Sequence, residues 1–423
     1  MVAVTLILGC SSERIGSKPR NVILLIGDGM GPGQVEAAGW YEFGLKYRTG
    51  GADRDGIEPG EEALSFEPYH KGEVITSSLD PGKVTDSAAA ATAMATGHKV
   101  KRQVLGLDPD GTSYPTMLEL FARRGKATGL VTTITIVNAT PAAFAAHQPD
   151  RYMYNEVAHD FLTGSRPNVL MGAVLQAKGI SEHPVAIGRG AYSAKAAGYD
   201  VVTTLDEMNA FVRRAEAARL QDSDLHLCGE LTIGSSMPFE YDRLEAEADL
   251  DPRAVDYRET PHLSEMTAAA LELLDNDRDG FFLMVEGGTI DTACHSGQLE
   301  RAVMETVEFS KAVQVVLDWV KGRSDTLVII TADHETGGLT PLANNGVGVF
   351  PEVVWLSKNH TGTRVPIYAL GPGSERIQGV LQNTDIFYIM TGMPVRRPPV
   401  ARTVAEPARA TEQSEPVPSM PAD

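Results

Sequence analysis

The sequence predicts an α/β fold built on a mostly parallel β-sheet. Apolar runs that are rich in β-branched residues and do not alternate with polar ones are typical of strands buried on both faces. Four such runs lie at 21–26, 129–136, 281–285 and 326–330. Helical stretches alternate with them, and 306–321 is the clearest because its apolar residues recur at helical spacing. This alternation favours a single α/β unit.

The first expected strand, 21–26, leads into the glycine-rich segment 27–33. Taken alone, such a segment is more commonly a plain turn between a strand and a helix than a functional loop. It matches neither the dinucleotide-binding fingerprint nor a P-loop. In the functional interpretation, the Asp28 carboxylate faces a site at the end of the strand, and the glycines keep its surroundings free of side chains.

A helix is expected at 88–97, directly after Thr85, Asp86 and Ser87. Its alanines propagate a helix, and Asp86 or Ser87 would cap the start. A plain N-cap is the more common meaning of this pattern. The alternative is that Ser87 is a nucleophile, because a helix N-terminus stabilises negative charge and a bound metal would favour the alkoxide.

The next two strands also run into oxygen ligands. Thr140 follows the run 129–136, and Glu286 follows 281–285 directly. Residues 275–286 also fit the calcium-binding EF-hand pattern. We reject calcium because 281–285 is an apolar strand, whereas an EF-hand has a partly polar loop there that supplies oxygen ligands. A turn between a helix and a strand is the better interpretation.

Imidazoles and further carboxylates follow at two more places. Asp291 and His295 are four residues apart, so one helical turn would set both on the same face. On its own this pair is as often a plain surface pair as a ligand pair. Asp333 and His334 follow the run 326–330 and add a carboxylate and an imidazole at another strand end.

The positions of these residues predict a metal site with more than one ion. In parallel sheets, ligands bind beyond the carboxyl ends of the strands, so side chains far apart in sequence meet there. Mixed carboxylate and imidazole sets suit Zn²⁺, and all-oxygen sets suit Mg²⁺. His360 and Arg151 cannot be assigned a function from their local sequence alone, since single residues of these types are usually surface residues.

Composition excludes some partners. The chain has 423 residues, a formal net charge of −19 and 22% charged residues. That balance argues against a nucleic-acid-binding surface, which needs clustered Lys and Arg. No apolar stretch approaches the ~18 residues that span a bilayer. The cysteines Cys10, Cys228 and Cys294 have neither metal-site spacing nor the number needed for a disulfide framework.

The two ends of the chain differ from its middle. Residues 6–12 resemble a bacterial lipobox, which predicts a lipid anchor at Cys10 and a periplasmic or membrane-anchored lipoprotein. The basic segment expected before a lipobox is missing, so an accidental match is equally open. We expect a signal remnant and linker at 1–19, a catalytic domain at 20–395 and a disordered Pro/Glu/Ala-rich tail at 396–423.

Taken together, five motifs resemble those of bacterial alkaline phosphatases and occur in the order of that family. They are NVILLIGDGMG (21–31), VTDSAAAATA (84–93), MVEGG with Ile290-Asp291 (284–291), TADHETGG (331–338) and HTGT (360–363). The resemblance covers roughly residues 20 to 393. It implies a three-layer α/β/α sandwich with a central, mostly parallel sheet, and an exported homodimer.

The resemblance also implies roles for individual residues. One zinc ion, which also touches Ser87, would be held by Asp28, Asp333 and His334. A second zinc ion would be held by Asp291, His295 and His360. One magnesium ion would be held by Asp28, Thr140 and Glu286. Arg151 stands at the position of the arginine that clamps the phosphate, where its planar fork grips two oxygens.

The chain departs from the family pattern at three places. Asn138 stands where the family commonly has Asp or His, which bears on the affinity and identity of the third metal. Thr292 stands where relatives often carry His, Lys or Trp, so contacts to the phosphate differ. Only 25 residues separate His334 from His360, so the large insertion of some relatives is absent.

The expected function is metal-dependent hydrolysis of small-molecule phosphate monoesters through a phosphoseryl intermediate on Ser87. Two alternatives stay open. A phosphodiesterase of the same superfamily would share the metal frame, although Arg151 beside the phosphate favours monoesters. A catalytically silent, metal-dependent phosphate-binding protein would use the same ligands. Sulfatases are excluded, because alanines follow Ser87 where their modified nucleophile needs Cys/Ser-x-Pro-x-Arg.

Overall fold

The computed structural model describes most of the chain. The described residues are 18–46, 62–175, 193–218, 225–248 and 257–394. The expected lipid-anchor residue Cys10 and the expected tail 396–423 lie outside them. The limits predicted for the catalytic domain therefore stay predictions.

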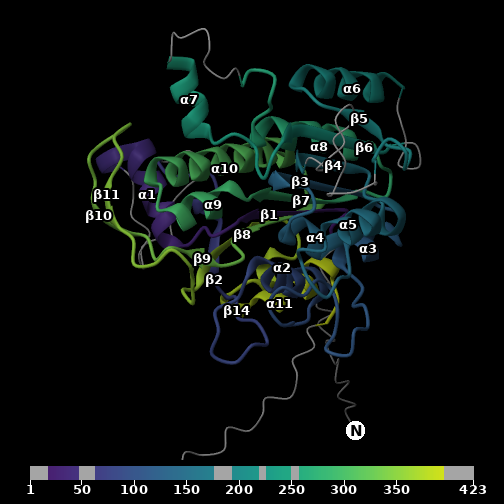
Figure 1. Cartoon of the computed structure of the whole chain (residues 1–423), viewed down its shortest axis with the longest axis horizontal. Helices are drawn as coiled ribbons and strands as arrows, with labels where there is room; N and C mark the ends of the chain where they lie inside the picture. Colours follow the sequence, from purple (N-terminus) through teal and green to yellow (C-terminus); the bar gives the residue numbers. More distant parts are fainter. Residues whose placement is uncertain (1–17, 47–61, 176–192, 219–224, 249–256, 395–423) are drawn as a thin grey trace, which may run out of the picture.

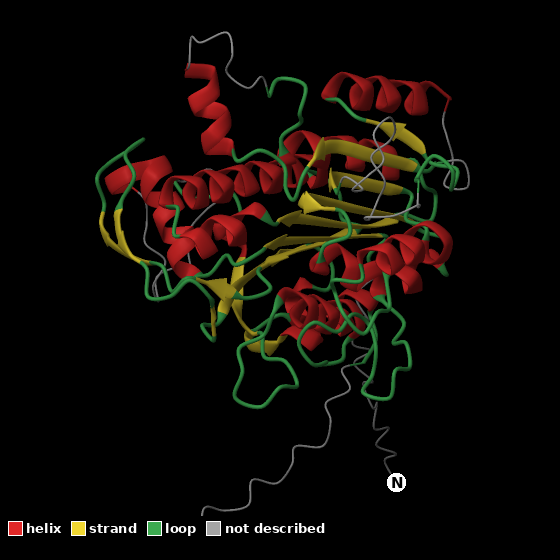
Figure 2. Ribbon diagram, in the orientation of Figure 1, coloured by secondary structure: helices red, strands yellow, loops and turns green. Residues whose placement is uncertain are grey.

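A ten-stranded sheet forms the centre of the molecule (Figures 1 and 2). Its strands are β1 (Asn21–Gly27), β2 (His70–Ile75), β3 (Ala127–Thr135), β4 (Val169–Val174), β5 (Asp200–Val202), β6 (Leu227–Ile233), β7 (Phe281–Gly287), β8 (Thr326–Thr331), β13 (Val365–Leu370) and β14 (Gly379–Gln382). Their order across the sheet is β14-β2-β13-β8-β1-β7-β3-β4-β6-β5. All neighbours pair in parallel except β13, which is antiparallel to β2 and to β8.

Helices cover both faces of this sheet (Figure 1). One layer holds α1 (Pro32–Phe43), α6 (Leu205–Ala218), α7 (Glu240–Ala248), α8 (Leu263–Leu274), α9 (Thr289–Ser296) and α10 (Leu299–Val320). The other holds α2 (Ser87–Thr96), α3 (Met117–Ala122), α4 (Ala139–Ala145), α5 (Tyr154–His159) and α11 (Asn383–Thr391). Short 3₁₀ or π turns lie at Gly44–Lys46, Glu67–Tyr69, Asp160–Ser165 and Ser374–Arg376. The predicted three-layer sandwich is confirmed.

Buried side chains explain why the central strands form. Every residue of β1, β7 and β8 is buried, as the unbroken apolar runs predict. The β7 ring of Phe282 stacks on Phe121 of α3 and Phe144 of α4, with ring centroids 5.5 and 5.9 Å apart. Each fully buried aromatic side chain of this kind contributes about 1.5–3 kcal/mol to stability. These contacts fasten one helical layer to the middle of the sheet.

The predicted helices and turns are found with small shifts. The helix expected at 88–97 is α2, and the Asp86 side chain caps it by accepting a hydrogen bond from Ala89 N at 3.1 Å. The helix expected at 306–321 is the C-terminal part of the longer α10. Residues 275–280 form the turn between α8 and β7 that the sequence predicts in place of an EF-hand. No helix in the described part of the chain is long and apolar enough to cross a membrane.

The strand register aligns the ends that carry the candidate ligands. Ile26 of β1 lies opposite Glu286 of β7 on one side and Thr331 of β8 on the other. Thr132 of β3 is also paired with Glu286. The residues that follow β1 and β8 therefore meet the end of β7 at one edge of the sheet.

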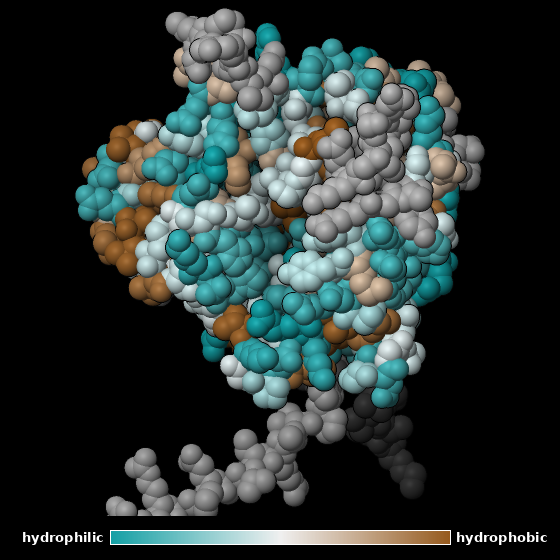
Figure 3. All heavy atoms as spheres, viewed as in Figure 1, coloured by the Kyte–Doolittle hydropathy of each residue, from teal (hydrophilic) through white to brown (hydrophobic). Residues whose placement is uncertain are grey.

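Two small antiparallel pairs lie beyond this edge. One joins β9 (Glu335–Thr336) to β12 (His360–Thr361), and the other joins β10 (Thr340–Ala343) to β11 (Glu352–Val354). We call residues 340–356 the arm. Exposed apolar side chains gather on it, namely Leu342, Val347, Val349, Val354 and Leu356. In Figure 3, brown patches at the left lie over this part of the molecule.

Candidate metal centre

Asp28 begins the site, in the tight turn that follows β1. The next residue, Gly29, has a φ of +73° and donates its backbone N–H to Asp333 Oδ1 at 3.2 Å. A Cβ at Gly29 would lie 3.0 Å from Asp291 Oδ1 and 2.9 Å from Thr336 Oγ1. The glycine therefore permits both the backbone conformation and the close approach of α9.

A first group of side chains surrounds His334, which is completely buried. Its Nε2 atom lies 3.1 Å from Asp333 Oδ2, 3.5 Å from Asp28 Oδ1 and 3.3 Å from the hydroxyl oxygen of Ser87. Ser87 is the first residue of α2. The serine hydroxyl thus lies beside an imidazole and two carboxylates that come from the ends of β1 and β8.

A second group comprises Asp291 and His295 of α9 and His360 of β12. The Nε2 atoms of the two histidines are 3.0 Å apart. Asp291 Oδ2 lies 3.3 Å from His295 Nε2, and Asp291 Oδ1 lies 3.6 Å from His360 Nε2. One potential ligand atom from each of the three residues fits within 4.8 Å, so this group has the composition and spacing of a metal site.

The two groups adjoin one another. The rings of His334 and His360 stack with centroids 3.5 Å apart. Asp28, Asp291 and His334 also bring one ligand atom each within 4.8 Å of one another. Six of the eight predicted metal ligands are therefore joined by short contacts.

The other two predicted ligands, Thr140 and Glu286, lie together below the surface. Thr132 Oγ1 donates a hydrogen bond to Glu286 Oε2, and the Thr140 side chain lies beside the same carboxyl group. Four buried oxygens of the centre form no hydrogen bond of normal geometry in the described structure, although two of them lie 3.1 and 3.5 Å from His334 Nε2: Asp28 Oδ1, Thr140 Oγ1, Glu286 Oε1 and Asp333 Oδ2. Buried polar atoms are rarely left unpaired, so these oxygens fit bound cations.

The pKa values of two carboxyl groups also indicate that the centre binds cations. Burial, and then the neighbouring carboxylates of Asp333 and Asp291, raise the pKa of Asp28 well above its ordinary value. Burial raises the pKa of Glu286 to about 7. Several acids in a dry site resist ionising together unless positive charge is supplied. Divalent cations would supply it.

The pKa values of the His360 and His295 imidazoles are shifted in opposite directions. Burial, and then the adjacent His334 ring, lower the pKa of His360 to about 4, so this ring stays neutral, as a metal ligand must be. The hydrogen bond to Asp291 raises the pKa of His295 to about 9. Burial tends to raise the pKa of Asp291, but its hydrogen bond to His295 and the nearby imidazoles outweigh burial and lower it.

Arg151 is held at the edge of the centre by two side chains that cap helices. Its Nη2 donates to Asn138 Oδ1 at 2.9 Å, and its Nη1 lies 3.5 Å from Asp86 Oδ2. Asn138 caps α4 by accepting from Ala139 N, and Asp86 caps α2 directly before Ser87. The guanidinium group is therefore anchored next to the serine, where it can bind an anion.

Glu335 links the two groups, a role that the sequence analysis missed. Its Oε2 accepts a hydrogen bond from Thr361, the neighbour of His360. Its Oε1 accepts from Gly338 N at 2.8 Å and from Gln34 Nε2 at 3.1 Å. One buried carboxylate thus fixes the segment after His334, the strand that carries His360 and the helix after Asp28. Its place inside the TADHETGG motif was the available signal.

Glu305 of α10 supports α9 from behind. Its Oε2 accepts a hydrogen bond from Thr289 Oγ1 at the start of α9, and its Oε1 accepts from Glu240 N at 2.7 Å. Burial, and then the charge of Glu240, raise the pKa of Glu305 to about 8. This side chain is therefore largely protonated at neutral pH.

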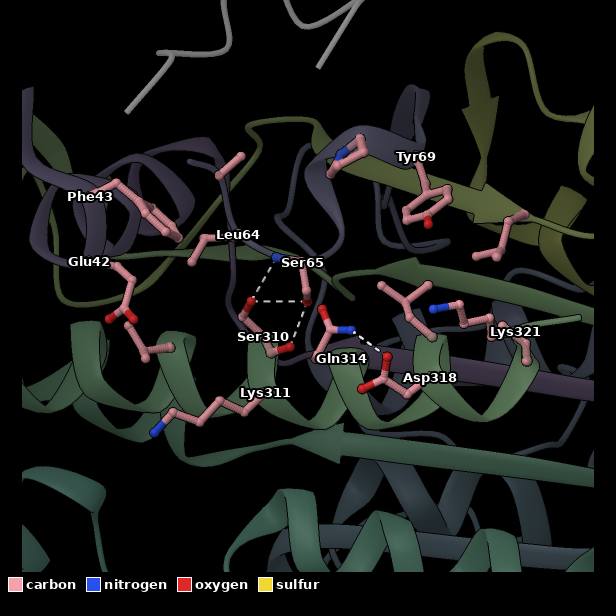
Figure 4. Close-up of a pocket in the computed structure, with 16 residues that line it drawn as sticks. Glu42, Phe43, Leu64, Ser65, Tyr69, Ser310, Lys311, Gln314, Asp318 and Lys321 are labelled. Carbon is pink, nitrogen blue, oxygen red and sulfur yellow. Dashed lines mark hydrogen bonds between the residues drawn. The ribbon is translucent and has the colours of Figure 1, made fainter. Parts of the chain in front are cut away.

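A separate cleft of about 580 Å³ lies along α10 (Figure 4). Ser65 and Ser310 are hydrogen-bonded to one another in its wall, at 3.0 Å between their hydroxyl oxygens, and Tyr69 and Gln314 also line it. The cleft shares no residue with the candidate metal groups. The metal site predicted from the sequence is therefore assigned to the strand ends and not to this cleft.

Comparisons with known proteins agree with the motifs. Residues 19–352 match the family model described as alkaline phosphatase. Alkaline phosphatase 4 of Bacillus subtilis is 30% identical, with 86% of this chain and 87% of that protein covered. Streptomycin-6-phosphate phosphatase of Streptomyces griseus is 32% identical, with 90% and 92% covered. Alkaline phosphatase of Escherichia coli is 30% identical, with 89% and 87% covered.

Solved structures are similar over nearly the same length. The cold-active alkaline phosphatase of a psychrophilic Shewanella species matches with a TM-score of 0.69 and 25% identity, covering 88% of this chain and all of that one. The alkaline phosphatase of the Antarctic bacterium TAB5 matches with a TM-score of 0.68 and 27% identity, covering 89% and 98%.

We predict that Glu335→Gln weakens metal binding although Glu335 is not one of the predicted ligands. The amide cannot accept hydrogen bonds from all of its present donors, so the segments that carry His334 and His360 would lose their fixed positions. Loss of such support typically costs about 10–100-fold in metal affinity. Competition with a chromophoric chelator, with Zn²⁺ as the probe ion, measures this. Glu352→Gln on the exposed face of β11 is the control, and equal affinities for wild type and Glu335→Gln would contradict the prediction.

We predict that Glu305 makes the protein less stable as pH rises from about 5 to 8. The folded state keeps the Glu305 proton up to a pKa of about 8, whereas the unfolded chain releases it near the ordinary value of 4.5. Stability therefore falls through this window, by at most about 1.4 kcal/mol per pH unit from this group. Urea unfolding at several pH values should show a flatter profile for Glu305→Gln. Glu247→Gln, on the exposed side of α7, should leave the profile unchanged. A Glu305→Gln profile as steep as that of the wild type would exclude this role.

Proposed function

This chain belongs to the alkaline phosphatase family and hydrolyses phosphate monoesters, and we propose that it does so through a phosphoseryl intermediate on Ser87. The observation that carries the proposal is the position of the Ser87 hydroxyl, which is buried 3.3 Å from His334 Nε2 among the carboxylates of the centre. An isolated N-capping serine would have no reason to lie there. The cap of α2 is instead supplied by Asp86.

The surroundings of Ser87 suit a nucleophile. The hydroxyl lies in the first turn of α2, whose N-terminus favours developing negative charge. The free N–H groups of such a turn also suit the oxygens of a phosphate. Because Asp86 caps α2 and also lies 3.5 Å from Arg151 Nη1, the guanidinium group is held beside the start of the helix that carries Ser87.

The centre requires metal ions, and we propose two zinc ions and one magnesium ion. Asp28, Asp333 and His334 would hold one zinc ion beside Ser87, and Asp291, His295 and His360 would hold the second. Asp28, Thr140 and Glu286 would hold magnesium, which prefers oxygen ligands. Their unpaired oxygens support this assignment. A variant of the TAB5 enzyme, 26% identical to this chain, is described with Mg bound in its M3 site.

The reaction then follows from the side chains. When bound, the divalent ions would favour deprotonation of hydroxyl groups and neutralise charge on the attacking and leaving oxygens. The Ser87 oxygen forms a bond to phosphorus as the bond from phosphorus to the alcohol oxygen breaks. Arg151 binds the phosphoryl oxygens with its planar fork. Water then cleaves the bond between phosphorus and the serine oxygen, releasing inorganic phosphate and restoring Ser87.

Among the described residues of the centre, exposure to solvent differs between the two groups, and the alcohol portion of the substrate would lie on the more exposed side. The side chains of Asp333, His334 and Asp28 are 0–5% exposed, whereas that of His295 is 39% exposed. Since in-line displacement sends the alcohol away from the serine, it departs past the Asp291, His295 and His360 group. A site that grips mainly the phosphate would accept many alcohols.

We also propose a location and an assembly for this protein. The lipobox-like segment 6–12 supports export and a lipid anchor at Cys10, facing the periplasm. The exposed apolar side chains of the arm support a homodimer, because large apolar patches commonly mark protein interfaces. Size-exclusion chromatography with light scattering, and mass spectrometry of the processed N-terminus, test these two proposals.

We expect Ser87→Ala to reduce kcat/KM for p-nitrophenyl phosphate by about a thousandfold or more, since removal of a nucleophile leaves only binding and electrostatic effects. Acid-quenched wild type incubated with ³²P-labelled substrate should carry label on Ser87, and the variant should carry none. Ser374→Ala, in a turn remote from the centre, is the control. Undiminished turnover by Ser87→Ala would eliminate this mechanism.

Metal content gives a second test. Elemental analysis should find zinc and magnesium in a ratio near two to one, and a chelator should abolish activity until both ions are restored. We further expect Asn138→Asp to tighten Mg²⁺ binding by roughly tenfold, because it adds a carboxylate near an all-oxygen site. Calorimetric titration of the zinc-loaded protein with Mg²⁺ measures this. Asn209→Asp on α6 is the control, and unchanged Mg²⁺ affinity in Asn138→Asp would refute the expectation.

A further inference from the structure

A cleft of about 350 Å³ opens beside the second candidate metal group. His295 and His360 form part of its wall, together with Lys83, Arg102 and Asn359. Thr85, whose carbonyl oxygen lies 3.0 Å from His360 Nδ1, also lines it. The cleft is therefore the outer opening of the centre, on the side where the alcohol portion of a substrate has room.

Two positive charges stand in this opening. The side chains of Lys83 and Arg102 are exposed, and neither has an ion pair or hydrogen bond with any other residue in the described part of the structure. Several of the other arginines described here form ion pairs, as Arg301 does with Asp242. The whole chain carries 56 acidic and 37 basic residues, so unpaired cations at the opening run against its overall charge.

The backbone at both residues is hydrogen-bonded to a single residue, Asp80. Asp80 Oδ2 accepts a hydrogen bond from Arg102 N at 2.7 Å, and the Asp80 carbonyl accepts one from Lys83 N at 3.3 Å. Leu79 N also donates to Val100 O at 2.8 Å, which ties the segments before and after α2 together. The two cations are therefore presented from defined positions on either side of the helix that begins at Ser87.

We propose that Lys83 and Arg102 select phosphate monoesters whose alcohol portion carries a second negative charge, either a carboxylate or another phosphate. The inference rests on the proposed function, because it needs the hydrolysed phosphate at Ser87 and the alcohol directed into this cleft. Opposite charges in a cleft raise both the encounter rate and the affinity for an anionic ligand. Arg102 adds a planar fork that matches a carboxylate or phosphate.

The expected effect of Lys83 and Arg102 on the affinity for an anionic substrate is moderate, because both side chains are in contact with solvent. Two exposed charge pairs together change binding by roughly three- to tenfold. Salt weakens the effect, since at physiological ionic strength such charges are screened over about 8 Å. A preference that shrinks as salt rises is therefore part of the prediction.

The test compares two substrates that share the phosphorylated end. Glycerol 3-phosphate ends in a hydroxymethyl group, and 3-phosphoglycerate ends in a carboxylate. We expect the zinc- and magnesium-loaded enzyme to show a higher kcat/KM for 3-phosphoglycerate. In the double variant Lys83→Gln, Arg102→Gln, the ratio of the two kcat/KM values should fall roughly three- to tenfold. Lys71→Gln, which removes an exposed charge at the start of β2, should leave the ratio as in the wild type.

A third substrate, 1,3-propanediol bisphosphate, carries a second phosphate and no carboxylate, and therefore distinguishes the two kinds of second anion. A larger loss for the bisphosphate than for 3-phosphoglycerate in the double variant would assign the cleft to phosphate, and the reverse would assign it to carboxylate. Equal ratios in wild type and double variant for every pair would overturn the proposal while leaving the hydrolytic function intact. Failure of the wild type to hydrolyse any of the three esters would instead overturn the proposed function.

Discussion

The structure depends on the burial of like charges at one edge of a sheet. The carboxyl groups after β1 and β8 and at the end of β7 lie together away from water, and several of their oxygens form no hydrogen bond in the described structure. Burial of unpaired charge is among the costliest arrangements in a protein. The surrounding frame is correspondingly firm: fully buried central strands, helices on both faces and a glycine at the closest approach. Bound metal ions would neutralise the repulsion between these carboxylates and link the segments that carry them.

The geometry of the centre depends on residues that position the candidate ligands as well as on the ligands themselves. Glu335 fastens three segments that each carry or follow a candidate ligand, and Glu305 fixes the start of α9 from the opposite side. Arg151 is likewise positioned by the residues that cap α2 and α4. Catalytic geometry of this kind needs rigid support, because small displacements of reacting groups cost large factors in rate.

Much of the fold and of the centre could be predicted from sequence, because buried parallel strands are unbroken apolar runs and their ends lie at one edge. The ends of these runs place Asp28, Glu286 and Asp333 at that edge. His360 and Arg151 could be assigned only from the family resemblance, since no local pattern distinguishes them. The roles of Glu335 and of the Lys83–Arg102 pair could not be predicted at all. They depend on which loops lie beside one another, and loop contacts leave no periodic signal.

The β9–β12 pair has a consequence for how this protein tolerates change. It fixes His360 next to the segment after His334 through a ladder of two residue pairs, while the residues between the two strands, 337–359, loop outward through the arm. Residues inserted between β10 and β11 would lengthen the arm without displacing the imidazoles of His334 and His360, because the β9–β12 pairing holds the two ends of the segment together. Surface loops whose ends are held together accept insertions at small entropic cost. A change in the length of the arm would therefore act on the proposed dimer interface while the ester-cleaving core stays undisturbed.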